Sequence, residues 1–356
     1  MAKRRRKKRA PRCEHHSSKR PHEVVHCTGG IGNRLRAIAS RVLVHGQRQE
    51  CARSKVVVLW QPSEFSPGAF DSTFLPTPPG SGVTVMPVAD ASQAASLRSK
   101  WHPDGVRVFG CNGLRLEGEE NEAGRMGPAP VVRLYQYLFR PTAALQQRMD
   151  TYLAQFPLRD CVGVHLRTTD HAVMFDTYAR RALAAGSITG STRNFTAGLF
   201  TAAWRRVAAL RAESHPPRCL FVAADSVPAA REWAAGDAVR GLRLAPSPHA
   251  AGEWLSTRPQ QHAAAAAAAA ATTTAEGRST TFGVGAPRTT ELVGGALDLL
   301  LLSNCGWFLG TMASSFSATV PRLRFFPSGR ASVLVPEPEQ YWTAAFKFRR
   351  SQLSHE

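Results

Sequence analysis

The chain has 356 residues, of which 43% are hydrophobic and 20% charged, and its formal net charge is +19. This hydrophobic content excludes a largely disordered polypeptide, because it is sufficient for a buried core. No apolar run reaches the roughly 18 residues of a membrane-spanning helix, so the sequence predicts no such helix.

A dense basic segment opens the chain. Ten of its first twenty residues are Lys or Arg, and Glu14 is the one acid among them. We expect residues 1–22 to form a disordered tail that contacts nucleic acid or an anionic membrane. No apolar segment follows the basic one, so no signal peptide is visible. The sequence as written therefore predicts the cytosol or nucleus; a different true start would place the chain in the ER or Golgi lumen.

The first half alternates short apolar runs with helical patterns, which is typical of a parallel sheet covered by helices in an α/β protein. We expect residues 23–158 to form one Rossmann-like domain. Its predicted strands are 23–27, 56–60, 83–87 and 105–110, and its predicted helices are 33–49, 130–139 and 142–156.

The second half repeats this alternation, and we expect residues 159–335 to form a second Rossmann-like domain. A low-complexity insertion at 246–285, with nine consecutive alanines, interrupts it. The final strand near 332–335 and a helix around 338–350, within a terminal segment 336–356, are expected to pack back across the first domain. The other predicted strands are 161–166, 218–224, 241–245 and 306–309, and the helices are 194–213, 228–235, 287–303 and 314–320.

A glycine-rich turn follows the first predicted strand and opens a helix. It contains Gly29, Gly30, Gly32 and Asn33. Glycines let the backbone approach a ligand closely, and a helix N-terminus attracts anions. The turn lacks the Gly-Lys-Ser/Thr ending of a Walker loop, and an ordinary strand-to-helix connection remains the alternative.

A His, an Arg and an Asp follow one another at the end of the strand predicted at 161–166. These residues are His165, Arg167 and Asp170. A guanidinium presents a planar fork of donors that fits phosphate oxygens, and ligands of open α/β sheets bind at the carboxyl ends of strands. The alternative is a surface Arg167 paired with Asp170.

Two further segments carry polar residues at predicted strand or helix ends. Ser314, Ser315 and Phe316 open a helix, where hydroxyls and amides suit an anion, although either serine could simply cap that helix. Asp225 ends an apolar strand and is followed by Ser226; it could accept hydrogen bonds from a ribose or guanine, or cap the next helix.

Together, the four segments resemble the fucosyltransferase superfamily that contains α1,6-fucosyltransferases, Nod-factor fucosyltransferases and protein O-fucosyltransferases. The matching segments occur in the family's order along the region 23–335. They are Gly29 to Asn33, Gly163 to Arg167, Ala223 to Ser226, and Asp298 to Phe316.

This resemblance implies a GT-B-like fold, in which two Rossmann-like domains face each other across a cleft. It also implies an inverting, metal-independent transfer of fucose from GDP-fucose to a glycan or protein hydroxyl, with the domain 23–158 on the acceptor side and 159–335 binding the nucleotide-sugar donor. For the nucleotide, the resemblance implies pyrophosphate binding by Arg167, nucleotide contact by His165, and guanine or ribose binding by Asp225. It also implies a phosphate cradle formed by Ser314, Ser315 and Phe316. Asn33, in the Gly29-Gly30-x-Gly32 turn, would contact the sugar or a phosphate.

The chain departs from the family pattern at two positions. Thr168 stands where several α1,6-type relatives have a second arginine, and Ala224 stands where a threonine is common. For the general base, the candidates are Asp170 and Glu64. The missing second arginine and the open choice of base leave an inactive nucleotide-binding module of the same fold as an alternative. A sulfotransferase is another, since it too needs a phosphate-cradling glycine turn, and the basic tail leaves open a nucleic-acid-binding protein.

The seven cysteines are widely spaced and form no Cys-x-x-Cys pair, so the sequence predicts neither a metal site nor a disulfide framework. We expect those in or beside buried strands to be free thiols that pack as small hydrophobes. These are Cys27, Cys161, Cys219 and Cys305.

Overall fold

We describe the fold from a computed structural model of the chain. The residues that the structure describes are 23–47, 56–63, 68–101, 107–110, 128–168, 170–186, 195–245, 248, 292–312, 314–324 and 332–335. The basic tail, the alanine-rich insertion and the terminal helix predicted at 338–350 lie outside them.

The first half contains a parallel four-stranded sheet with strand order β3-β2-β1-β4. Val25 and Cys27 of β1 belong to the core cluster that includes residues of α1, whereas Val24 packs with Ala94 of α2 on the other face. Side chains of a strand alternate between faces, so one apolar strand can serve both layers. The elements are β1 (Glu23–Cys27), α1 (Ile31–Gln47), β2 (Val56–Trp60), the short helix η1 (Phe70–Ser72), β3 (Val83–Pro87), α2 (Ala91–Trp101) and β4 (Arg107–Gly110).

The second half contains a parallel five-stranded sheet with strand order β7-β6-β5-β8-β9. Val162, Val164 and Leu166 of β5 pack with α6, α7 and α8, and the opposite face of the strand meets α10 and α11. The elements are η2 (Leu158–Asp160), β5 (Cys161–Leu166), α6 (Asp170–Ala184), α7 (Phe195–Arg211), β6 (Cys219–Ala224), α8 (Val227–Ala234), η3 (Asp237–Val239), β7 (Arg243–Ala245), α10 (Leu292–Asn304), β8 (Trp307–Thr311), α11 (Ser315–Leu323) and β9 (Ser332–Val335).

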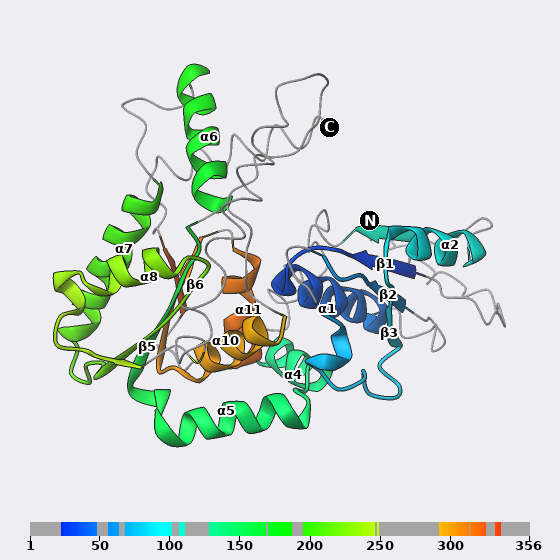
Figure 1. Ribbon diagram of the computed structural model, residues 1–356, viewed down its shortest axis with the longest axis horizontal. Coiled ribbons are helices and arrows are strands. Elements are labelled where there is room, and N and C mark those ends of the chain that lie inside the picture. The colour runs from blue at the N-terminus through cyan, green and yellow to red at the C-terminus, as the bar shows by residue number, and fades with distance from the viewer. Residues whose placement is uncertain are drawn as a thin grey trace, which may run out of the picture.

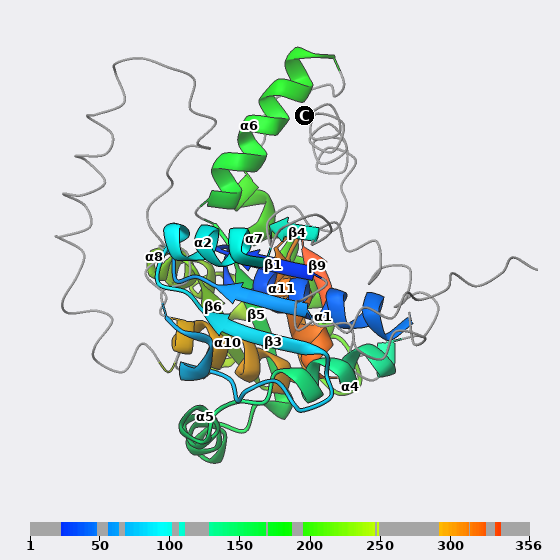
Figure 2. The same cartoon turned by 90° about the vertical axis from the view of Figure 1, so that its right-hand side faces the viewer.

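The helices α4 (Pro128–Leu138), α5 (Ala143–Gln155), α10 and α11 connect the two halves of the molecule. α4 and α5 follow the first sheet along the chain but pack against α11 and α10, and α11 also packs against α1. In Figure 1 the orange helices α10 and α11 lie between the green strands β5 and β6 and the blue helix α1, and Figure 2 shows the first sheet from its side of the molecule. One hydrophobic cluster accordingly contains residues of both halves, from Val25 of β1 to Leu323 of α11.

The predicted α/β architecture with parallel sheets is confirmed, and β1, β2, β3, β5 and β9 have the predicted bounds. Two helices, α2 and α6, were not predicted. The expected return of the strand at 332–335 to the first domain is wrong: β9 pairs with β8, from Phe308–Ser332 to Thr311–Val335. The predicted boundaries at 158 and 335, and the cleft between the domains, stay predictions.

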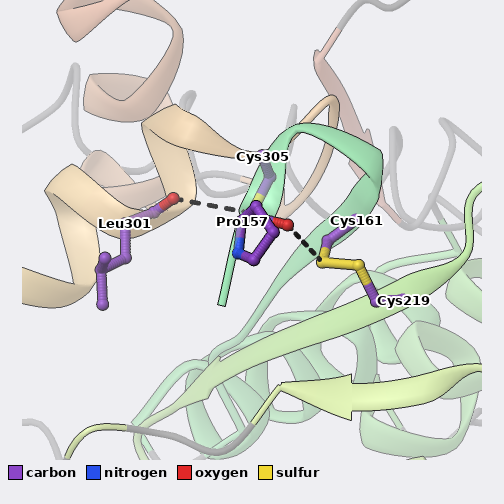
Figure 3. Close-up of a disulfide and its surroundings, with 5 residues drawn as sticks. All are labelled: Pro157, Cys161, Cys219, Leu301 and Cys305. Atoms are coloured by element: carbon purple, nitrogen blue, oxygen red, sulfur yellow. Dashed lines mark hydrogen bonds between the residues drawn. A yellow bond between two sulfur atoms is a disulfide. The ribbon is translucent and has the colours of Figure 1, made fainter. Parts of the chain in front are cut away.

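The expectation that the buried cysteines are free thiols is wrong for three of the four. Cys161 and Cys219 form a disulfide (Figure 3), and Cys27 is also disulfide-bonded. Cys161 and Cys219 are direct register partners on β5 and β6, with Cα atoms 4.3 Å apart. Sequence spacing misses such a pair because strand pairing, not proximity along the chain, brings its sulfurs together.

Cys305 is the one free cysteine among the described residues. It is fully buried at the end of α10, where its Sγ donates to the Leu301 carbonyl at 3.5 Å. Burial raises the pKa of this thiol, because the thiolate would lose its hydration. No helix in the described part of the chain has both the length and the apolar character to span a membrane.

Candidate functional site

Three neighbouring strands of the second sheet end at one edge, and the polar residues predicted from sequence follow them there. β5 leads into Arg167 and Thr168, β6 leads into Asp225, and β8 ends at Thr311 shortly before α11. Because the sheet is parallel, these carboxyl ends lie side by side. The edge therefore gathers segments that are about 145 residues apart in sequence, as the hydrogen bond between Arg167 and Thr311 shows.

Gly163 allows α10 to pack closely on β5. A methyl group at this position would lie 2.8 Å from Cys305 Sγ and 3.1 Å from Leu302 Cδ2. Both distances are shorter than a comfortable van der Waals contact. The glycine of the Gly-x-His-x-Arg segment thus serves packing in this structure, and it places the strand that carries His165 and Arg167.

His165 is buried and directed toward α11. Its Nδ1 lies 2.7 Å from Ser317 Oγ, and its ring stacks on Phe316 with centroids 4.5 Å apart and an interplanar angle of 20°. The hydrogen bond and the stacked ring fix the imidazole in one orientation. His165 and Phe316, predicted separately from two motifs, are therefore in direct contact.

Arg167 is half-buried just beyond the end of β5. Its Nη1 donates to Ser314 Oγ at 3.5 Å, and its backbone N–H donates to Thr311 Oγ1 at 2.9 Å. The guanidinium therefore lies beside the first turn of α11, where unpaired backbone N–H groups and the helix dipole also carry positive charge. This combination of donors suits a phosphate group.

Ser314 caps α11. Its side chain accepts from the Ser317 backbone N–H at 3.4 Å, so the capping role considered in the sequence analysis is present. Ser315, the first residue of the helix, is buried, with 8% of its surface exposed. The serines thus build the helix start, and Ser314 additionally contacts Arg167.

Asp225 ties the ends of β5 and β6 together. Its Oδ1 accepts from the backbone N–H of Thr168 at 2.9 Å and from Thr168 Oγ1 at 3.2 Å. Ser226 provides the cap of α8 instead, accepting from the Ala229 N–H at 3.3 Å. Guanine or ribose binding by Asp225 stays a prediction, and Thr168 has a role here that a second arginine could not fill in the same way.

The glycine-rich turn meets the same region from the first half of the molecule. A methyl group on Gly32 would lie 2.6 Å from backbone atoms of Ser315 and Phe316, so the missing side chain lets α1 cross α11 at close range. The turn therefore abuts the helix start that carries Ser314, Ser315 and Phe316. Its Gly32 contacts protein backbone rather than standing open for a ligand.

Arg34, two residues after Gly32, is completely buried beneath the glycine-rich turn. Its Nε donates to the Gly29 carbonyl at 2.5 Å, its Nη2 donates to Ser63 Oγ at 3.2 Å, and its guanidinium lies 4.5 Å from the centre of the Trp60 ring. Burial lowers the pKa of Arg34 to about 10. The side chain thus joins the turn to the end of β2.

Four other predicted site residues, Gly30, Asn33, Asp170 and Glu64, have no contact with Arg167 or His165 that can be described. Asn33 is half-buried on α1, and Gly30 accepts the Arg34 backbone N–H at 3.2 Å. Asp170 is the first residue of α6, but its side chain is not among those described, and Glu64 lies outside the described residues. Both general-base candidates stay predictions.

Sequence reasoning assigned no role to Thr311, Ser317 or Arg34. Thr311 lies within the segment Asp298 to Phe316 and Ser317 directly follows it, but their roles become visible only in the structure, where both are buried and a buried hydroxyl requires a partner. In the described part of the chain, no group of three or more His, Cys, Asp or Glu side chains could hold a metal ion.

No protein-family model and no curated protein matches this sequence. Among solved structures, the chain is similar to the fucosyltransferase NodZ from Bradyrhizobium, with 14% identity, coverage of 86% of this chain and 94% of that chain, and a TM-score of 0.46. It is also similar to an Arabidopsis thaliana FUT1 variant in complex with GDP, with 10% identity, coverage of 90% and 71%, and a TM-score of 0.45. A third similar structure is POFUT1 in its apo form, with 11% identity, coverage of 90% and 99%, and a TM-score of 0.42.

Proposed function

We propose that this protein is a glycosyltransferase that transfers fucose from GDP-fucose to a hydroxyl group of a glycan or protein. In this proposal the carboxyl edge of the second sheet binds the nucleotide-sugar donor, and the first half of the molecule faces the acceptor. The proposal includes inversion at the transferred carbon and no required metal ion, in line with the family that the motifs resemble.

One observation carries the proposal: the Arg167 guanidinium lies against Ser314 at the N-terminus of α11. Two independent sources of positive potential, a side chain and a helix start, thus converge at the carboxyl ends of parallel strands. This is the place in the fold where ligands of open α/β sheets bind. A diphosphate is the group that this arrangement suits best.

The same arrangement suits the chemistry of sugar transfer. Cleavage of the bond between the sugar and the phosphate leaves GDP with growing negative charge, and a pre-oriented guanidinium and helix amides stabilise that charge. They supply in part what a divalent cation supplies elsewhere, which supports a metal-independent reaction. The acceptor hydroxyl loses its proton to a base, for which Asp170 and Glu64 remain the proposed groups.

The test is calorimetric binding of GDP to the full chain without added metal, compared with Arg167→Ala. We expect the variant to bind GDP about 10- to 100-fold more weakly, because a charge-assisted hydrogen bond is lost. With GDP-fucose and an acceptor, we expect turnover to fall by about 10²–10³-fold.

Arg159→Ala is the matched control for this experiment. Arg159 is exposed and precedes β5 at the opposite end of the same strand, so its loss should leave GDP affinity unchanged. Equal GDP affinity of the native chain and Arg167→Ala would contradict the assignment of the donor site. Tighter binding of adenosine than of guanosine nucleotides would favour a sulfotransferase instead.

A further inference from the structure

We propose that Thr311 is a positioning residue that holds Arg167 in place through the backbone of β5. This inference rests on the proposed function, since Arg167 is the residue expected to bind the donor diphosphate. Nothing in the motif pattern assigns a role to Thr311, which lies at the last position of β8.

The side chain of Thr311 continues the pairing of two strands past the point where their register ends. β5 and β8 are paired from Val162–Trp307 to Val164–Leu309. Beyond that pair, Thr311 Oγ1 donates to the His165 carbonyl at 2.8 Å and accepts from the Arg167 backbone N–H at 2.9 Å. One hydroxyl therefore binds the backbone on both sides of Leu166.

Only a side chain that both donates and accepts can make these two bonds. A hydroxyl has one O–H donor and two acceptor lone pairs, whereas valine, which has nearly the same shape as threonine, has neither. Thr311 is completely buried, so water cannot readily replace its hydroxyl. Removing the hydroxyl would leave the His165 carbonyl and the Arg167 N–H without this partner.

The other side of the same segment is held by β6. The Asp225 N–H donates to the Leu166 carbonyl at 3.2 Å, and Asp225 Oδ1 accepts from the Thr168 N–H at 2.9 Å. The backbone from His165 to Thr168 is therefore bound alternately by Thr311 and by Asp225. A guanidinium whose main chain is fixed on both sides keeps its direction toward Ser314, and such pre-orientation is what anion stabilisation requires.

The test compares Thr311→Val and Thr311→Ser with the native chain, using GDP and guanosine as ligands. Guanosine lacks the diphosphate and so does not depend on Arg167. We expect Thr311→Val to bind GDP about tenfold more weakly, because small displacements of a positioned group are costly, and to bind guanosine as the native chain does. Thr311→Ser retains the hydroxyl and should restore most of the GDP affinity.

A double variant of Thr311 and Arg167 distinguishes loss of Arg167 positioning from general destabilisation of the fold. In an Arg167→Ala background, Thr311→Val should weaken GDP binding no further. Ser40→Ala is the control for loss of a buried hydroxyl: Ser40 Oγ donates to the Ala37 carbonyl at 3.1 Å within α1, and we expect its loss to lower the unfolding temperature while leaving the GDP-to-guanosine affinity ratio unchanged. The inference would be overturned if Thr311→Val lowered the affinities for GDP and guanosine equally. It would also be overturned if Thr311→Val weakened GDP binding as much in the Arg167→Ala chain as in the native chain.

Amide hydrogen exchange gives a readout that needs no nucleotide. We expect the Arg167 amide to exchange faster in Thr311→Val than in the native chain, and at the native rate in Thr311→Ser. If the Arg167 amide exchanges faster in Thr311→Val but the native chain does not bind GDP, the backbone contact is supported and the proposed function is contradicted. Unchanged exchange together with native GDP binding would overturn the positioning role alone.

Discussion

Arg34 illustrates how a residue next to a binding motif can serve the structure instead of the ligand. The sequence places it directly after Asn33, where an arginine could be taken for a phosphate ligand. Its guanidinium is instead enclosed by the Gly29 carbonyl, Ser63 and the face of Trp60. With a pKa lowered to about 10, the group stays charged at neutral pH, so its burial requires these contacts.

We expect Arg34→Lys to lower the free energy of unfolding by about 2 kcal/mol, measured by urea denaturation at pH 7. A lysine ammonium is a point donor, which cannot bond both oxygens and stack on Trp60 as a planar fork does. Arg133→Lys on the exposed face of α4 is the control and should change stability by no more than about 0.5 kcal/mol. Equal stability of the two variants would mean that the fork geometry is unimportant.

The residues that sequence reasoning placed together share a simple physical reason. His165 lies near the end of one buried strand and Arg167 follows it, and Ser314 and Phe316 lie at the start of a helix after a neighbouring strand. Parallel strands end at a common edge, so these residues meet. Thr311 and Ser317 escape such reasoning, because their roles depend on distances across the sheet that no local pattern encodes.

At the scale of elements, α1 and α11 cross at Gly32. The N-termini of both helices lie at this crossing, so the first half of the chain touches the helix start proposed to bind the donor. Since Phe316 also stacks on His165, a displacement of α11 at the crossing would reach the candidate site directly.

We expect Gly32→Ala to destabilise the protein by about 1–3 kcal/mol, although alanine has the higher helix propensity, because the added methyl would collide with backbone atoms of α11. GDP affinity should fall as well, since Phe316 must shift. Thermal unfolding and calorimetry measure the two effects. Ser96→Ala on the exposed surface of α2 controls for helix propensity alone; a Gly32→Ala variant as stable as this control would refute the close crossing.

Strands were easier to predict than helices, and the reason lies in burial. β2 is a continuous apolar run, and β1 and β5 are apolar apart from Glu23, His26 and His165, because helices cover both faces of their sheets. α2 presents no comparable pattern: Ala94 is its one fully buried residue, and serine, lysine and arginine occupy much of the rest. An amphipathic stripe is the usual signal of a surface helix, so a helix with so small an apolar face is missed.

At the scale of the whole molecule, the Cys161–Cys219 disulfide bears on where the protein folds. Disulfides persist in oxidising compartments and are rare in the cytosol. We propose that the chain matures in such a compartment, in agreement with the ER or Golgi alternative of the sequence analysis rather than the cytosol or nucleus.

Cysteine alkylation tests this proposal, and the stability of a cysteine variant measures what the bond contributes. Alkylation of the unfolded chain, isolated from its own cells and denatured in the presence of the reagent, should leave Cys161 and Cys219 unmodified unless a reductant is added first. The bond closes a loop of 58 residues, so a Cys161→Ala/Cys219→Ala double variant should lose about 4 kcal/mol of unfolding free energy. Complete alkylation without reductant would place the protein in a reducing compartment.

The disulfide lies at the amino edge of the second sheet, whereas the candidate site lies at its carboxyl edge. Six residues of β5 separate them, about 20 Å along an extended strand. Removal of the bond should therefore leave ligand affinity intact while raising the unfolded population by about 10³-fold. Proteases act on that population, so the bond would determine how long each molecule survives rather than how well it works.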